Sequence, residues 1–245
     1  MNTLIFDHIK KKLQDVWHLD KHQQIRDSIN ASTVLDTLPW TPARKEKLKN
    51  SLEQAFGVPI ELSGTVTDLT RRTDNLYLRW FFGEVWRPRT DKYAFSGWQL
   101  ADMINRYDPK NVLDVGCGYN QFKERIPNLI GLDPYNNNAD YMIDILDYRV
   151  EAGSHDHIIA LGSINFNTED EIIDRFGHCV ELLAPGGRIW MRCNPGIPHV
   201  NGPWVQIFHW NFEFAHRLAK EFGLNLETLK QDQDRLFLIF NKNAT

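Results

Sequence analysis

Apolar residues in the first part of the chain recur every three or four positions, which is the spacing of one face of a helix. One set predicts a helix over residues 4–17: Ile5, Ile9, Leu13 and Val16. A second helix starts at the N-cap and first-turn proline Thr41-Pro42, carries Leu48, Leu52 and Phe56, and stops at Gly57. A third is predicted over residues 67–82, through Leu69, Leu76 and Trp80. Residues 1–82 are therefore expected to be all-helical.

Beyond a linker over residues 83–95, the pattern changes to short apolar runs that alternate with helices. Ser96 and Gln99 form a capping box before the first of these helices. Seven strands are predicted, near residues 111–115, 129–133, 141–145, 157–163, 188–193, 224–230 and 235–241. A polar turn joins the last two into a hairpin. Residues 96–245 are therefore expected to form a doubly wound α/β sheet of seven strands with an antiparallel last strand.

The first strand of this region opens into a glycine turn, VLDVGCGYN over residues 112–120. Glycine permits a tight turn and a close approach to a ligand, because it has no Cβ. The next apolar run, LIGLDPY, ends in Asp133, which lies 19 positions beyond Asp114. That spacing suits a carboxylate that accepts both hydroxyls of a ribose. The sequence thus predicts a nucleoside-binding α/β protein.

The glycine turn lacks the third glycine of a dinucleotide fingerprint, and it reads D-x-G-x-G-x-N from Asp114 to Asn120. This pattern resembles motif I of the class I S-adenosylmethionine (SAM)-dependent methyltransferases. YMIDI, HIIALGS and LLAPGGRIWMR resemble later segments of the same family. The resemblance implies SAM as the cofactor, with Asp133 at the ribose and Asp144 and Ile145 at the adenine. The full set of implied cofactor-binding residues is Asp114, Gly116, Cys117, Gly118, Asn120, Asp133, Pro134, Asp144, Ile145 and Leu161.

The acceptor side of the site is expected after the fourth and fifth predicted strands. The fourth ends in Leu161 to Phe166, without the Asn/Asp-Pro-Pro-aromatic tetrapeptide of amino-methylating DNA enzymes. Ser163 and Asn165 are candidate catalytic residues that can hydrogen-bond an acceptor, with loop capping as the alternative.

The segment after the fifth strand is rich in Pro, Gly, His and Trp, which suits a loop over an acceptor. In it, His209 is a candidate base, and His199 and Trp204 are candidate substrate-binding residues. His209, Glu213 and His216 share a helical face at a spacing compatible with a metal, but such spacings occur often by chance, and no metal is expected.

Charge is distributed unevenly along the chain. Residues 1–95 carry 15 Lys/Arg against 12 Asp/Glu, whereas residues 96–245 carry 13 against 20. An acidic catalytic part disfavours duplex DNA as the substrate, because phosphate contacts need a basic surface. The acceptor is therefore expected to be a small molecule rather than a nucleic acid. The three cysteines form no C-x-x-C pair, and no signal-peptide pattern or long apolar run is present, which together indicate a cytoplasmic protein without a membrane span.

Two alternatives remain from the sequence. Six basic residues interleave with aromatic ones between Arg71 and Lys92, which would suit an RNA methyltransferase. The same stripe also fits helix packing with solvated arginines. A SAM-binding protein without catalytic activity is the other alternative, because the loop after the fourth strand is neutral.

The order of helices in residues 1–82, with LEQAFGVPIEL closing the second, is similar to that of an acyl carrier protein. The family carries its phosphopantetheine arm on a serine near the start of the second helix. Thr41-Pro42 stands there in this chain, which implies that nothing is attached covalently.

Overall fold

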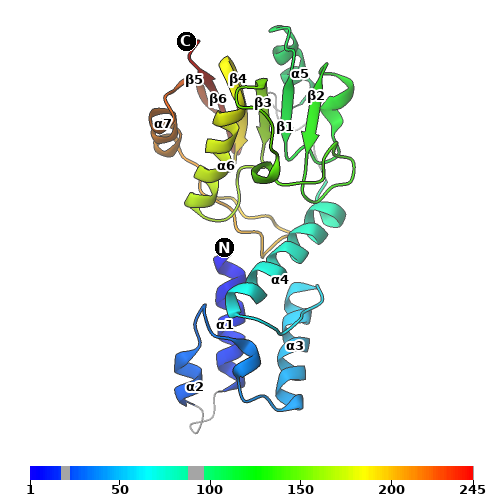
Figure 1. The fold of residues 1–245 in the computed structure, drawn as a ribbon, viewed down its shortest axis with the longest axis vertical. Coiled ribbons are helices and arrows are strands. Elements are labelled where there is room, and N and C mark those ends of the chain that lie inside the picture. The colour runs from blue at the N-terminus through cyan, green and yellow to red at the C-terminus, as the bar shows by residue number, and fades with distance from the viewer. Residues whose placement is uncertain (18–22, 88–96, 245) are drawn as a thin grey trace. The chain divides into compact units, whose positions relative to one another are not determined.

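The computed structural model describes residues 1–17, 23–87 and 97–244. Residues 88–95 of the predicted linker and Ser96 of the predicted capping box lie outside this range, as do Arg89 and Lys92. The chain forms two compact units (Figure 1): the helical unit holds Met1–Glu84 together with His199–Gln206, and the sheet unit holds Val85–Pro198 together with Ile207–Thr245.

The helical unit contains α1 (Thr3–Val16), α2 (Gln23–Ser28), α3 (Pro42–Phe56) and α4 (Val66–Trp80), with a 3-10 turn at Leu35–Thr37 and a π-helical turn at Phe81–Val85. The faces predicted for α1 and α3 are buried in one core, which includes Ile5, Leu13, Leu48 and Leu52. Side-chain caps start three of these helices, from Asn2, Thr41 and Thr65. The two long N-terminal helices therefore form where the apolar spacing predicts them.

Helix α4 lies where it is predicted, but it buries a different face. Leu76 and Trp80 are 43% and 39% exposed, whereas Thr70, Thr73 and Tyr77 are buried. The Thr70 hydroxyl donates to the Val66 carbonyl, so a polar side chain is satisfied within the helix and can be packed inside. The predicted burial of Leu69 is confirmed, whereas that of Leu76 and Trp80 is wrong.

Trp204 belongs to the core of the helical unit, although it follows the sheet in sequence. Its indole nitrogen donates to the Ala55 carbonyl at 2.9 Å. Its ring makes edge contacts with Phe56 and His8, at centroid distances of 4.9 and 4.8 Å. The Asn2 amide donates to the Trp204 carbonyl at 2.8 Å. These are the contacts of a packing residue and indicate a structural role for Trp204. Its substrate-binding role stays a prediction.

This placement predicts that Trp204→Ala lowers the free energy of unfolding of the helical unit by about 3–5 kcal/mol, the cost of truncating a packed aromatic residue. Urea denaturation followed by far-UV circular dichroism measures the loss. Trp80→Ala is the matched control, because Trp80 is 39% exposed and its removal is expected to cost under about 1 kcal/mol. Equal losses in the two variants would contradict the packing role of Trp204.

The sheet unit is built on one six-stranded sheet among the described residues, in the order β2-β1-β3-β4-β6-β5. Its strands are β1 (Val112–Val115), β2 (Leu129–Leu132), β3 (His155–Leu161), β4 (Leu183–Cys193), β5 (Leu224–Asp232) and β6 (Arg235–Lys242). The first four are parallel, and β6 pairs antiparallel with both β4 and β5. The predicted doubly wound sheet with an antiparallel last strand is therefore confirmed.

The third predicted strand, over residues 141–145, does not form. Tyr141 makes a single bridge to Leu132, and the Asp144 carboxylate then accepts the Leu146 N–H and starts a 3-10 turn at Ile145–Asp147. The apolar alternation of Tyr141, Ile143 and Ile145 imitates a strand. The capping aspartate ends the pairing after one residue, because it offers the backbone a local partner.

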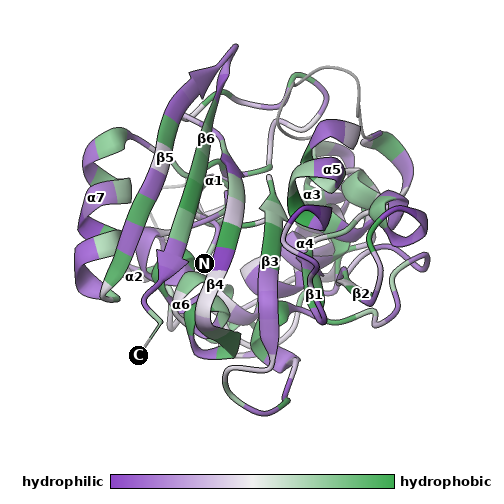
Figure 2. Cartoon of the chain, turned by 90° about the horizontal axis from the view of Figure 1, so that it is seen from above, coloured by the Kyte–Doolittle hydropathy of each residue, from purple (hydrophilic) through white to green (hydrophobic). Residues whose placement is uncertain are grey.

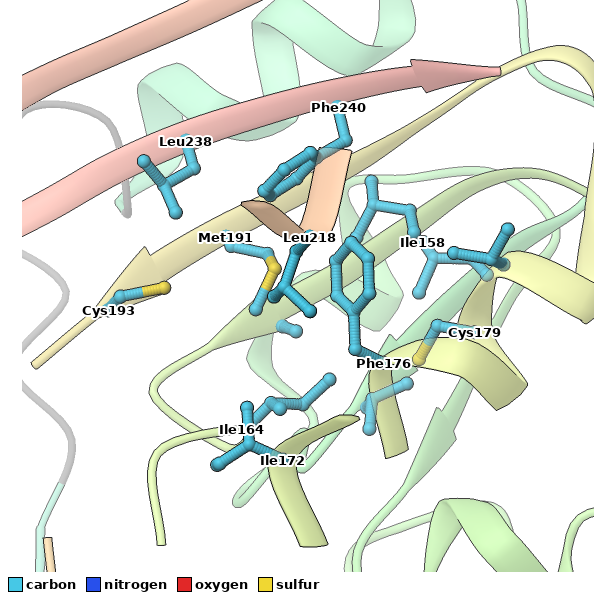
Figure 3. Packing of buried hydrophobic residues seen from close by; sticks show 14 of the residues in the cluster. Ile158, Ile164, Ile172, Phe176, Cys179, Met191, Cys193, Leu218, Leu238 and Phe240 are labelled. Atoms are coloured by element: carbon cyan, nitrogen blue, oxygen red, sulfur yellow. The ribbon is translucent and has the colours of Figure 1, made fainter. Parts of the chain in front are cut away.

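Helices cover both faces of the sheet. On one face, α6 (Glu169–Leu182) and α7 (Phe212–Glu221) bury a core with β3, β4 and β6, in which Phe176 lies beside Ile158, Cys179 and Phe240 (Figure 3). On the other face, α5 (Trp98–Asn105) packs with Phe122 and Ile126. Helix α7 shows alternating hydrophobic and hydrophilic bands (Figure 2), as expected when one side faces the sheet. No helix in the described part of the chain is long and apolar enough to cross a membrane.

Candidate functional site

The glycine loop, residues 116–120, leaves the carboxyl end of β1, which lies between β2 and β3. The chain runs from β1 to one neighbour and later returns to the other, so the loop stands at a topological switch point of the sheet. Open α/β sheets bind their ligands there. Two backbone N–H groups, of Gly116 and Cys117, donate to the Leu132 carbonyl at 2.7 and 2.9 Å and hold the loop against the end of β2.

Every second residue of this loop adopts the left-handed conformation. Gly116, Gly118 and Asn120 have φ values of +70°, +55° and +55°. The first two positions have glycine, and the third has asparagine. Asparagine tolerates this region better than most residues, and its side chain also forms hydrogen bonds here. The Asn120 amide donates to the Asn138 carbonyl at 3.1 Å and to Asp140 at 3.3 Å.

Close contacts surround the loop on three sides. A Cβ on Gly116 would overlap the Ser163 Cβ at the end of β3. A Cβ on Gly118 would lie 3.3 Å from the Trp86 ring. Within β2, a Cβ on Gly131 would stand only 2.5 Å from the Asn120 side-chain oxygen and 2.8 Å from the Cys117 sulfur. The loop is thus packed so tightly that its glycines are required for space as well as for backbone conformation.

Asp133, at the carboxyl end of β2, fixes the loop by its carboxylate. One oxygen accepts the Gly118 N–H at 2.9 Å, and the other accepts the N–H groups of Tyr135 and Asn136 at 2.8 and 2.9 Å. Burial raises the pKa of Asp133, whereas these three donors lower it. A carboxylate has about four acceptor positions, so the oxygen bound to Gly118 keeps one for a further donor.

Asp114 is buried beside Asp133, with 2% of its surface exposed. Burial, with the Asp133 charge adding to it, raises the pKa of Asp114 to about 7. Burial also raises the pKa of Cys117, and the neighbouring carboxylates of Asp114, Asp133 and Asp140 act in the same direction. The Cys117 thiol therefore stays protonated and is not a nucleophile.

Asp140 also shapes the site, and the sequence analysis missed it. Its carboxylate accepts the Gly131 N–H at 2.8 Å and pairs with the Lys123 ammonium at 2.9 Å. Hydrogen bonds from Gly131, Lys123 and Asn120 lower the pKa of Asp140 against the opposing effect of burial. The only sequence signal was an acid seven residues after Asp133, which is too common a pattern to interpret.

The residues assigned to the adenine side lie in the turn after β2. The second Asp144 oxygen binds the Arg175 guanidinium of α6 at 3.2 Å, so both oxygens of this carboxylate have protein partners. The Ile145 side chain is 3% exposed and belongs to the core between the sheet and α6. Pro134 is half-buried directly after Asp133.

The end of β3 joins the end of β4 through Asn165. Its side-chain oxygen accepts the Asn194 N–H at 3.0 Å, and its carbonyl accepts the Phe208 N–H at 2.8 Å. Asn165 is 4% exposed. The Leu161 carbonyl accepts a hydrogen bond from Arg192 of β4 at 3.0 Å. These contacts make Asn165 a residue that ties the two strand ends together.

Ser163 differs from Asn165, because its buried hydroxyl has no hydrogen-bond partner among the described residues. A buried hydroxyl without a partner is costly. This one lies against Gly116, where a bound molecule could satisfy it.

His209 lies at the same edge of the sheet as Ser163. Its backbone bridges to Pro195, as Ile207 bridges to Phe166, so the chain after β4 is paired with the loops that follow β3 and β4. The His209 ring is exposed, and a Cβ on Gly196 would lie 3.3 Å from it. His199, by contrast, contacts Phe81 within the helical unit. In the part of the chain that the structure describes, no three His, Cys, Asp or Glu side chains are placed to hold a metal ion.

Known structures share this architecture. The chain matches the N-methyltransferase NodS of Bradyrhizobium japonicum WM9, solved with S-adenosylhomocysteine, at a TM-score of 0.52 and 16% identity over 69% of this chain and 98% of that one. It also matches 1,6-didemethyltoxoflavin-N1-methyltransferase of Burkholderia thailandensis, solved with 1,6-didemethyltoxoflavin and S-adenosylhomocysteine, at 0.50 and 13% over 86% and 94%. The chain has the class I methyltransferase fold. At this level of identity, the likeness is one of fold. No protein-family model and no curated protein matches the sequence.

The connections after β1 and after β2 contain short 3-10 turns and no α-helix. A 3-10 turn at Gln121–Glu124 stands between β1 and β2, and another at Ile145–Asp147 stands between β2 and β3. The glycine loop is therefore held by side chains, chiefly Asp133, Asp140 and Asn120, rather than by the start of a long helix.

Proposed function

We propose that this chain is a SAM-dependent methyltransferase that acts on a small molecule. The observation that carries the proposal is the glycine loop at the switch point, with its Gly118 N–H bound to the Asp133 carboxylate. The two neighbours of known activity, both crystallised with S-adenosylhomocysteine, support SAM as the cofactor.

The residues at the switch point fit a nucleoside cofactor with an amino-acid end. Gly116 and Gly118 let the backbone approach a ligand, Asp133 keeps an acceptor position for a ribose hydroxyl, and the Ser163 hydroxyl has no partner of its own. Asp144, with its carboxylate oriented by Arg175, is the adenine-side residue of the proposal, next to the backbone of Ile145. When bound, SAM supplies a methyl group that its sulfonium already activates.

The role left to the protein is to orient the acceptor and to take up a proton where the acceptor carries one. His209 is the proposed base, because it is exposed at the carboxyl ends of β3 and β4 and an imidazole nitrogen can accept a proton. Ser163 is the proposed hydrogen-bond donor beside the glycine loop. Asn165 positions this edge through Asn194.

The charge of the chain supports a small acceptor. Residues 96–245 carry 20 acidic residues against 13 basic ones. A nucleic-acid substrate would need a basic surface on this part. In the segment proposed for RNA, Tyr77 and Phe81 are 2% exposed, and Arg72 donates to the carbonyls of Glu61 and Ser63. Those residues therefore support the fold of the helical unit.

Asp133→Ala is the experiment that tests the cofactor site. The variant loses the acceptor for a ribose hydroxyl and releases the Gly118 N–H, and both changes weaken binding. Because charge-assisted hydrogen bonds are worth about 1.5–3 kcal/mol, we expect the affinity for S-adenosylhomocysteine to fall at least about tenfold in isothermal titration calorimetry.

Asp156→Ala is the matched control for this variant. The Asp156 carboxylate also accepts two backbone N–H groups, of Lys110 and Asn111, but it lies at the amino end of β3. We expect it to lower stability and to leave the affinity within about twofold of the wild type. Unchanged binding in a folded Asp133→Ala protein would sink the ribose assignment, and a wild type that binds neither SAM nor its product would sink the proposed function.

A further inference from the structure

Helix α6 holds both ends of the 3-10 turn Ile145–Asp147, which follows β2. At one end, Nε and Nη2 of Arg175 donate to Oδ2 of Asp144 at 3.3 and 3.2 Å. At the other end, Nε2 of His178 lies 3.0 Å from the Tyr148 carbonyl oxygen. All of these residues belong to the sheet unit. The position of the Asp144 carboxylate therefore depends on a helix that comes later in the chain.

The donors around Asp144 leave its carboxylate one acceptor position for a ligand. Oδ2 accepts two N–H groups of Arg175, which occupy both of its lone pairs. Oδ1 accepts the Leu146 N–H at 3.0 Å, and within the described residues it has no second donor. The Asp144 side chain is 29% exposed, so a ligand can reach this remaining position.

Arg175 is itself restrained by its own helix. Its Nη1 donates to the Glu171 carbonyl at 3.3 Å and lies 4.0 Å from the Glu171 carboxylate. A guanidinium held in this way is a planar partner with fixed donor directions, whereas the ammonium of a lysine is a point charge on a flexible chain. The direction in which Oδ1 of Asp144 points is therefore set by Arg175.

We propose that Arg175 is a positioning residue that makes the cofactor site select adenine over hypoxanthine, an inference that rests on the proposed function. A carboxylate accepts hydrogen bonds and donates none. The exocyclic amine of adenine offers it a donor, whereas hypoxanthine has a carbonyl oxygen in that place. By occupying Oδ2, Arg175 leaves only Oδ1, in one direction, to distinguish the two bases.

The test compares S-adenosylhomocysteine with S-inosylhomocysteine, in which hypoxanthine replaces adenine. In isothermal titration calorimetry, the wild type is expected to bind the adenine ligand at least about tenfold more tightly, because the other ligand leaves a charged acceptor without its hydrogen bond. Arg175→Met fills similar space without the charge and the donors. We expect the ratio of the two dissociation constants to fall to within about threefold in this variant, and Arg175→Lys to recover part of the ratio.

His178→Ala is the matched control, because it loosens the same turn without contacting Asp144. It is expected to weaken both ligands by the same factor and to leave the ratio unchanged. An Arg175→Met protein with the wild-type ratio overturns the inference, and so does one with a higher ratio, because Arg175 would then compete with the base. If Arg175→Met does not fold, the Arg175→Lys ratio decides, and a wild-type ratio there also overturns the inference.

The wild type separates this inference from the proposed function. Equal binding of the two ligands overturns the selection of adenine and leaves the proposed function intact. A wild type that binds neither S-adenosylhomocysteine nor SAM overturns both.

Discussion

Gly116→Ala is expected to destabilise the sheet unit and to abolish most of its cofactor affinity. The residue has φ of +70°, where a side chain costs about 1–2 kcal/mol. The new methyl group would also overlap the Ser163 Cβ, and overpacking of this kind costs about 1–3 kcal/mol more. Relief of the overlap moves the end of β3 away from the glycine loop. We expect affinity for S-adenosylhomocysteine to fall at least about tenfold, or about 1.4 kcal/mol.

Two variants separate backbone strain from overlap in this experiment. Gly223→Ala has the same kind of backbone, with φ of +64°, but nothing lies within 4 Å of its Cβ. It is expected to lose only the strain energy in urea denaturation and to bind as the wild type does. The double variant Gly116→Ala/Ser163→Gly removes the overlapping atom and is expected to recover part of the lost stability. If Gly116→Ala loses no more stability or affinity than Gly223→Ala, the close contact between Gly116 and Ser163 does not restrict residue 116 to glycine.

The glycine loop is the part of the site that the sequence predicts well. Its backbone demands are local, so they are visible as residue types: glycine at two left-handed positions and asparagine at the third. Asp133 follows for the same reason, since it is the residue that ends the neighbouring parallel strand. A position that needs a particular φ, or that follows the end of a strand, can be recognised from its residue type and its neighbours in sequence.

Contacts between distant segments were not predictable from local patterns. Nothing in residues 199–206 indicates that Trp204 packs on Ala55 and Phe56, about 150 positions earlier. Trp86 likewise shows no sequence relation to Gly118, which its ring covers. An apolar or aromatic residue type predicts burial, but it does not identify the residues against which the side chain packs. Periodicity also fails where polar side chains are satisfied locally, as at Thr70 on α4 and Asp144 after β2.

Asp114→Asn is expected to remove a large pH dependence of stability. The pKa of Asp114 is about 7 in the folded protein, against an ordinary value of 3.8 for an aspartate side chain. A raised carboxyl pKa means that the folded state binds the proton more tightly than the unfolded state. The contribution of Asp114 is therefore fully present below about pH 4, and it is lost as the pH rises toward 7. Each unit of that pKa difference corresponds to about 1.4 kcal/mol.

His157 has the opposite effect over an overlapping range. It is buried against Trp190, whose indole donates to it at 3.0 Å, and burial lowers the pKa of His157 from 6.5 to about 4. The unfolded state then binds the extra proton, so the contribution of His157 grows as the pH rises from about 4 to 6.5. The total stability curve mixes the two residues, and only a difference between variants isolates Asp114.

The measurement is therefore the free energy of unfolding of wild type and Asp114→Asn, from urea denaturation at pH values between 4 and 8. Asparagine has nearly the shape of a protonated aspartic acid, so the two proteins are expected to be similar near pH 4. The wild type should then lose stability relative to the variant by up to about 1.4 kcal/mol per pH unit until pH 7. His157→Gln is the control, with a difference of the opposite sign. A flat difference for Asp114→Asn would show that the buried carboxyl is ionised at its ordinary pKa, and the raised pKa would then be wrong.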